Sequence, residues 1–207
     1  MLTRWSSLIS QTRATTRTLD EFTILLIAAA SIAASLIVRP SALGVVGGGL
    51  AILMIAIAVI DARRFIIPNE LTFAALALGF LNAAMQDSGS VIEMLAGAAL
   101  RGTVLAFAFL GLRVLYRRIR GREGIGLGDV KLAGVAGVWL DWWMLPVAIE
   151  IAALAALSVY ALRLLQGQAS VRLMTKLPFG LFFAPAIWVG WLLESTLFPI
   201  SLAALLQ

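Results

Sequence analysis

Apolar residues form long stretches along the chain, separated by short polar or basic segments. A transmembrane helix needs about 20 mostly apolar residues, with a range of roughly 17 to 25. We therefore expect an all-α fold, a polytopic transmembrane bundle of about six or seven spans. The candidate spans are 22–38, 43–60, 70–86, 92–116, 129–143, 144–165 and 179–200.

The fifth span is the shortest, and it ends near Asp141, Trp142 and Trp143. At 1.5 Å per residue it extends only about 20 Å, so a thinly embedded or re-entrant segment is one alternative. The basic residues favour a spanning helix. If the segment were re-entrant, Arg172 and Lys176 would fall on the side away from the other basic residues.

Basic residues are concentrated at one end of the predicted helices, which places that end in the cytoplasm. They are Arg4, Arg13, Arg17, Arg63, Arg64, Arg117, Arg118, Arg120, Arg122, Arg163, Arg172 and Lys176. The opposite end carries Arg39, Asp87, Glu93, Asp141 and Glu194. We expect residues 1–20 to form a cytoplasmic tail and residues 21–207 a single transmembrane domain.

Composition agrees with a protein whose surroundings are mostly lipid. Hydrophobic residues make up 61% of the chain and charged residues 13%, against about 25% charged residues in soluble domains. The net charge of +5 is explained by membrane orientation rather than by binding to nucleic acid. The expected partner surface is therefore the lipid bilayer.

The chain contains no cysteine and no histidine. A cysteine nucleophile, a Ser-His-Asp triad and an HExxH zinc site are therefore excluded. No ligand set indicates a metal, and no cofactor is expected. Acid/base chemistry must come from Asp, Glu, Lys, Arg or Tyr.

Two aspartates stand at the edges of apolar stretches, where an ionisable group is costly and is a functional candidate. Asp61 ends one apolar run, and Asp129 follows a basic loop at the start of another. The predicted topology places both at the cytoplasmic ends of their helices. Two adjacent carboxylates share a proton, so one can activate water while the other polarises a carbonyl.

Gly126 and Gly128 flank this second aspartate on its N-terminal side. Glycine has no Cβ, so a substrate backbone can approach closely here. The alternative is a turn at the membrane surface in which Asp129 caps a helix N-terminus.

Three segments together resemble the type IV prepilin peptidases, a family of GxGD membrane aspartic peptidases. They are Asp61–Thr72 (DARRFIIPNELT), Arg120–Leu132 (RGREGIGLGDVKL) and Leu177–Gly180 (LPFG). In order, they cover nearly the whole chain from about residue 45. Residues 1–40 match nothing that we can assign.

The resemblance implies an endopeptidase that removes short basic leader peptides from prepilin-like and pseudopilin precursors. It carries the catalytic pair over to Asp61 and Asp129, and it places the enzyme in the bacterial inner membrane. Gly126, Gly128, Lys131 and the run Pro178, Phe179 and Gly180 are then site-supporting residues. The absence of paired cysteines indicates a form without the methyltransferase segment that many members carry.

Several other residues have two interpretations. Lys131 either tunes the aspartate pair or extends to the membrane surface. Arg63 and Arg64 are interpreted as orientation anchors, and Glu123 as a solvated residue or a contact for the basic leader.

Two structural expectations can be tested directly. Pro68 and Asn69 predict a helix start, with proline in the first turn and asparagine as a cap. Arg101 and Glu150 are each placed deep in a span, and we expect them to pair because lone buried charges are costly.

Three other readings remain. A presenilin-like intramembrane protease also uses a GxGD loop, but its Pro-Ala-Leu motif is replaced here by Pro178, Phe179 and Gly180. A proton- or cation-coupled transporter would use Asp61 and Asp129 as a relay, and it would require paired broken helices in two related halves. A non-catalytic assembly subunit would tolerate loss of both aspartates.

Overall fold

The computed structural model describes residues 21–86, 90–121, 124–166 and 178–197. This part of the chain is helical, which confirms the predicted all-α bundle. It contains an N-terminal helix (Glu21–Val38), α2 (Ala42–Arg64), α3 (Asn69–Ala84), α4 (Val91–Arg120), α5 (Leu127–Trp139), α6 (Met144–Leu165) and α7 (Phe179–Leu197). The expected tail 1–20, Glu123, Arg172 and Lys176 lie outside the described residues.

Within the described ranges, five helices are long and apolar enough to cross a membrane. These are the N-terminal helix, α2, α4, α6 and α7, whereas α3 has 16 residues and α5 has 13. The predicted fifth span extended to residue 143, but α5 ends at Trp139. The reason is a turn at Asp141, whose carbonyl accepts the N–H groups of Met144 and Leu145 (2.9 and 3.1 Å) and thereby starts α6.

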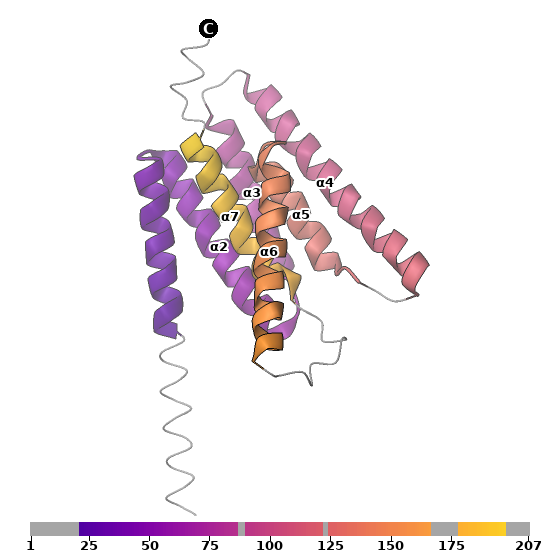
Figure 1. The fold of residues 1–207 in the computed structure, drawn as a ribbon. Helices are drawn as coiled ribbons and strands as arrows, with labels where there is room; N and C mark the ends of the chain where they lie inside the picture. The colour runs from indigo at the N-terminus through magenta and orange to yellow at the C-terminus, as the bar shows by residue number, and fades with distance from the viewer. Residues whose placement is uncertain (1–20, 87–89, 122–123, 167–177, 198–207) are drawn as a thin grey trace, which may run out of the picture.

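The short helix α5 lies at the centre of the bundle. It packs against α4 on one side and against α3 and α7 on the others, while α7 also packs against α2 and α6 (Figure 1). The N-terminal helix stands at the edge beside α2 (Figure 1). Leu132, Ala133, Val135 and Ala136 of α5 are buried, so the helix that carries Asp129 is held by neighbours from three directions.

Two glycines confirm that small residues allow close helix contacts in this bundle. A Cβ at Gly47 would stand 2.0 Å from the indole of Trp191, and one at Gly137 would stand 2.5 Å from the main-chain oxygen of Arg101. Such approaches bring α2 onto α7 and α4 onto α5, as helix packing in lipid favours.

The predicted pair of Arg101 and Glu150 is wrong. Arg101 instead binds Asp141 (Nη1 to Oδ1, 3.1 Å) and donates through Nε to the carbonyl of Gly137 (3.3 Å). Glu150 is exposed on α6, and no ion pair joins it to Arg101 among the described residues. Depth along the helices was similar for both residues, but the direction in which each side chain points depended on the packing of the bundle.

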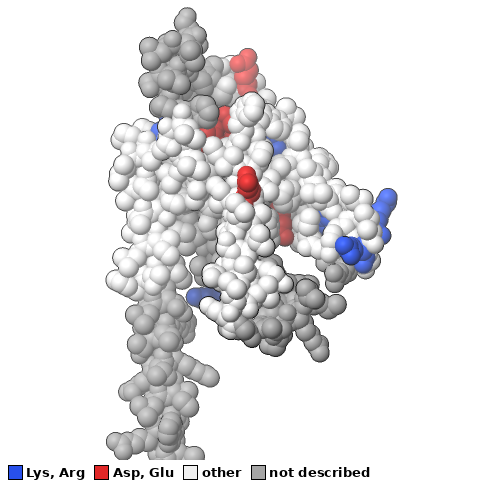
Figure 2. All heavy atoms as spheres, viewed as in Figure 1, with Lys and Arg blue, Asp and Glu red and all other residues white. Residues whose placement is uncertain are grey.

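Basic side chains gather where α4 ends, as Figure 2 shows. Arg117, Arg118 and Arg120 form the last turn of this helix, and Arg63 and Arg64 form the last turn of α2. The two helices run in parallel through the bundle (Figure 1). The described basic clusters therefore lie at one end of the molecule, as the sequence predicted.

Candidate active site

Asp61 lies in the last turns of α2 and is only 5% exposed. The helix ends just beyond it at Phe65, whose left-handed backbone (φ 54°) lets its N–H bond to the carbonyl of Asp61 (2.9 Å). This cap turns the chain sharply toward α3. A buried carboxylate therefore sits directly inside a helix end rather than out on a loop.

The N-terminus of α7 holds the Asp61 side chain. The N–H of Leu181 donates to its Oδ2 (3.0 Å), and helix N-termini favour negative charge. A Cβ at Gly180 would stand 2.8 Å from the same oxygen. Glycine at this position therefore allows the start of α7 to lie against the carboxylate.

Asp129 lies in the first turn of α5 and is half-buried. Its Oδ2 accepts a hydrogen bond from the N–H of Gly126 (3.1 Å), the residue at the N-cap position of the helix. The capping role raised for Asp129 as an alternative is thus confirmed. Capping does not exclude chemistry, because the carboxylate also faces the cavity that contains Asp61.

One cavity of about 610 Å³ brings the two aspartates together. Its walls come from the end of α2, the turn into α3 and the start of α5, and they include Gly126, Gly128 and Lys131, three of the residues expected to support the site. Arg64, interpreted from sequence as an orientation anchor, also lines this cavity. The expectation that Asp61 and Asp129 share one end of the bundle is confirmed.

Ile67 joins the three motif segments, although it was not among the site residues expected from the sequence. Its side chain is 7% exposed and would stand 3.0 Å from a Cβ at Gly128 and 2.9 Å from one at Gly180. The two glycines therefore let the starts of α5 and α7 close onto this side chain. The available signal was a short apolar run, Phe65 to Ile67, between Arg64 and Pro68.

Lys131 connects the two aspartate segments by donating to Oδ1 of Asn69. Asn69 therefore does not cap α3: Pro68 takes the cap position, with its carbonyl accepting the N–H of Thr72 (3.2 Å). The prediction of the helix start was right, but the two roles were shifted by one residue. The reason is that the amide of Asn69 is engaged by α5.

Pro178 and Phe179 support the start of α7. Phe179 packs on Phe183 (ring centroids 5.2 Å apart), which stacks in turn on Phe109 of α4 (5.8 Å). Pro178 directly precedes the helix. Phe179 thus packs through Phe183 toward α4, whereas Gly180 is the member of the run that contacts Asp61.

The electrostatics of Asp129 follow from its position just outside the long spans. Burial raises the pKa of its carboxyl above the ordinary value, and the nearby charge of Asp61 raises it further, while the Gly126 N–H lowers it. Among the described residues, no Lys or Arg forms an ion pair with either aspartate. A carboxyl so placed retains its proton to higher pH than an exposed aspartate does.

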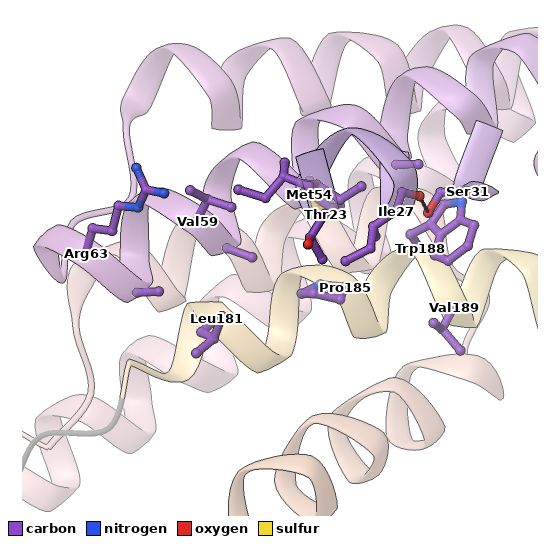
Figure 3. Close-up of a pocket in the computed structure, with 15 residues that line it drawn as sticks. Thr23, Ile27, Ser31, Met54, Val59, Arg63, Leu181, Pro185, Trp188 and Val189 are labelled. Carbon is purple, nitrogen blue, oxygen red and sulfur yellow. Dashed lines mark hydrogen bonds between the residues drawn. The ribbon is translucent and has the colours of Figure 1, made fainter. Parts of the chain in front are cut away.

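A second, apolar cavity of about 470 Å³ lies on the other side of α2, between that helix, the N-terminal helix and α7 (Figure 3). Two of its polar wall groups form hydrogen bonds: Ser31 donates to the carbonyl of Ile27 (2.8 Å), and the Trp188 indole donates to Ser35 (3.1 Å). No Asp, Glu, Lys or Tyr is among the residues that line this cavity, and its one charged lining residue is Arg63.

Residues 48–162 match the type IV leader peptidase family, and the chain belongs to that family. The matched range contains Asp61 and Asp129, whereas the α7 segment lies beyond it. The chain is 33% identical over 146 residues to a prepilin leader peptidase/N-methyltransferase from Burkholderia pseudomallei (strain 1026b), which covers 70% of this chain and 45% of that protein.

Two further relatives show the same pattern. A prepilin leader peptidase/N-methyltransferase of Pseudomonas aeruginosa is 32% identical over 144 residues, covering 67% of this chain and 46% of that protein. Leader peptidase HopD of Escherichia coli is 33% identical over 133 residues, covering 63% of this chain and 82% of that protein. The chain thus spans less than half the length of the N-methyltransferase relatives, and no solved structure matches.

Proposed function

We propose that this protein is a membrane-embedded aspartic endopeptidase that removes short basic leader peptides from prepilin-like and pseudopilin precursors. One observation carries the proposal. Two carboxylates from separate segments line one cavity at one end of the bundle, in a chain of the type IV leader peptidase family. The names of its relatives support the substrate class.

Asp61 and Asp129 would act as a pair that holds one proton. The ionised member removes a proton from water as the water oxygen attacks the scissile carbonyl, and the protonated member donates to the carbonyl oxygen. The tetrahedral intermediate then expels the amine, which takes up a proton from the pair. Because the two groups titrate together, neither is assigned alone as acid or base.

The basic ends of α2 and α4 support placing the aspartate cavity at the cytoplasmic face of the bacterial inner membrane. The N-terminus then lies in the cytoplasm. A leader peptide would reach the pair from the aqueous side, and no nucleic acid is needed. The lack of cysteine and the likeness to a protein named only as a leader peptidase favour peptidase activity without methylation.

The decisive experiment is co-expression with a candidate prepilin, with cleavage followed by the mobility shift of the precursor on a gel. We expect Asp61→Asn and Asp129→Asn each to reduce cleavage by roughly 10³-fold or more. Both variants should accumulate in the membrane as wild type does. Glu150→Gln, which removes an exposed carboxylate on α6, is the matched control and should cleave normally.

Full cleavage by either aspartate variant would overturn the proposal. Proton flux into liposomes that required both aspartates, without any cleavage, would favour the transporter instead. The assembly-subunit reading predicts that pilus assembly survives both substitutions.

A further inference from the structure

Arg113 of α4 contacts the loop that leads to Asp129, although it lies outside the three motif segments. Its side chain is half-buried, and its Nη1 donates to the carbonyl of Ile125 (3.2 Å). Ile125 directly precedes Gly126, which occupies the N-cap position of α5. The contact therefore ties the loop that leads into α5 back onto α4, the helix that precedes it.

The Ile125 carbonyl and the Gly126 N–H belong to the same peptide unit. This unit is planar and trans, so its C=O and N–H groups point in opposite directions. One side accepts from Arg113 (3.2 Å), and the other donates to Oδ2 of Asp129 (3.1 Å). The three groups form a continuous chain of hydrogen bonds from a guanidinium to a candidate catalytic carboxylate.

The same face of α4 supports the loop at a second point. A Cβ at Gly124 would stand 2.5 Å from the ring of Tyr116, so the loop backbone lies directly on this ring. Tyr116 follows Arg113 by three residues and therefore shares its helix face. Contacts on both sides of Ile125 leave the peptide unit little freedom to rotate.

We propose that Arg113 is a positioning residue for Asp129 and acts through the Ile125–Gly126 peptide unit. The inference rests on the proposed function for its catalytic meaning, but the hydrogen-bond chain itself can be tested without cleavage. Arg113 orients the peptide and polarises it, because successive hydrogen bonds strengthen one another and a charged donor strengthens them most. The Gly126 N–H thereby becomes a better donor to the ionised carboxylate.

The direction of the effect follows from this arrangement. A hydrogen bond to the ionised form lowers the pKa of a carboxyl, so loss of Arg113 should raise the pKa of Asp129. The other charged groups that face the cavity remain in place in this test. They are Asp61 and Arg64 of α2, Glu70 of α3 and Lys131 of α5, and the described part of α7 adds none at this end.

The sequence offers a direct probe of this peptide. Ile125–Gly126 is the only Ile-Gly step in the chain, so protein labelled with ¹³C-carbonyl isoleucine and ¹⁵N-glycine gives one coupled amide signal. The Gly126 proton shift, followed against pH in the full-length protein in detergent or nanodiscs, reports ionisation of Asp129. Asp129→Asn must abolish the titration step for this assignment to hold.

We expect Arg113→Ala to move the midpoint upward by about 0.5 pH unit or more. Arg118→Ala, which removes an exposed arginine from the same helix away from the loop, should leave the midpoint unchanged. If the alanine variant does not fold, Arg113→Lys replaces it, with a smaller shift in the same direction. An unchanged midpoint in a folded Arg113 variant would overturn the inference.

The pH profile of cleavage gives a second readout. An effect on folding alone lowers the amount of active enzyme without moving the profile, whereas loss of the hydrogen-bond chain moves it toward higher pH. If the wild-type protein cleaves no precursor, the proposed function fails. The Gly126 titration would still decide the role of Arg113.

Discussion

The carboxylates at the two ends of the bundle have different kinds of partner. The inner end of the bundle is the end that holds the aspartate cavity, and the outer end is the opposite one. At the outer end, Asp141 is paired with the guanidinium of Arg101 (3.1 Å), and its backbone N–H donates to Glu194 (3.2 Å). At the inner end, Asp61 and Asp129 are held by the backbone N–H groups of Leu181 and Gly126. No cation forms an ion pair with either one within the described part of the chain.

Asp141 thus forms a structural ion pair, whereas the contacts of Asp61 and Asp129 suit acid/base chemistry. The ion pair holds the Asp141 side chain against Arg101. At Asp129 a backbone donor orients the carboxylate, while burial and the nearby charge of Asp61 raise its pKa. The comparison predicts that the inner contacts govern activity and the outer contacts govern stability.

The largest expected effect on cleavage is at Gly180, where neighbouring atoms leave no space for a Cβ. Gly180→Ala would put a methyl group 2.8 Å from Oδ2 of Asp61 and 2.9 Å from Ile67. We expect cleavage to fall about 10²-fold, because a displacement near 1 Å is enough to misalign reacting groups. Gly111→Ala, with nothing within 4 Å, is the control, and equal rates for the two variants would refute this account of α7.

The next effect concerns stability at the outer end. Arg101→Met leaves Asp141 without its cation and should lower the free energy of unfolding by about 1–3 kcal/mol, toward the low side because the Asp141 side chain is 60% exposed. Denaturant unfolding in mixed micelles would measure the loss. Glu150→Gln should change the free energy of unfolding by less than about 0.5 kcal/mol. A larger loss of stability for Glu150→Gln than for Arg101→Met would indicate that Arg101 pairs with Glu150 after all.

The smallest effect is expected where Lys131 donates to Asn69 across the aspartate cavity. Lys131→Met and Asn69→Ala should each slow cleavage by about 5-fold, the value of one ordinary hydrogen bond. The double variant should be no slower than either single variant, because all three lack the same contact. Additive losses would instead indicate that Lys131 acts on the aspartates or the substrate directly.

The positions of the helices could be predicted from the sequence because the hydrophobic effect acts locally along a span. Apolar stretches located all seven described helices, although the helix that begins at Leu127 ended earlier than expected. The basic residues indicated which ends lie together, and from these ends the sequence predicted that Asp61 and Asp129 share one face. Each of these conclusions needs only the order of residues and the thickness of a membrane.

Side-chain partners required the tertiary structure. Because Arg101 and Glu150 have similar depths along their helices, the sequence suggested that they pair. The rotation of each helix about its axis instead turns Arg101 toward Asp141. Ile67 and Leu181 entered the site because α5 and α7 converge on the end of α2. Sequence alone determined that this chain is a helical membrane protein with two aspartates at one end; only three-dimensional packing decided what holds each carboxylate, since hydrogen bonds depend on direction and distance rather than on order along the chain.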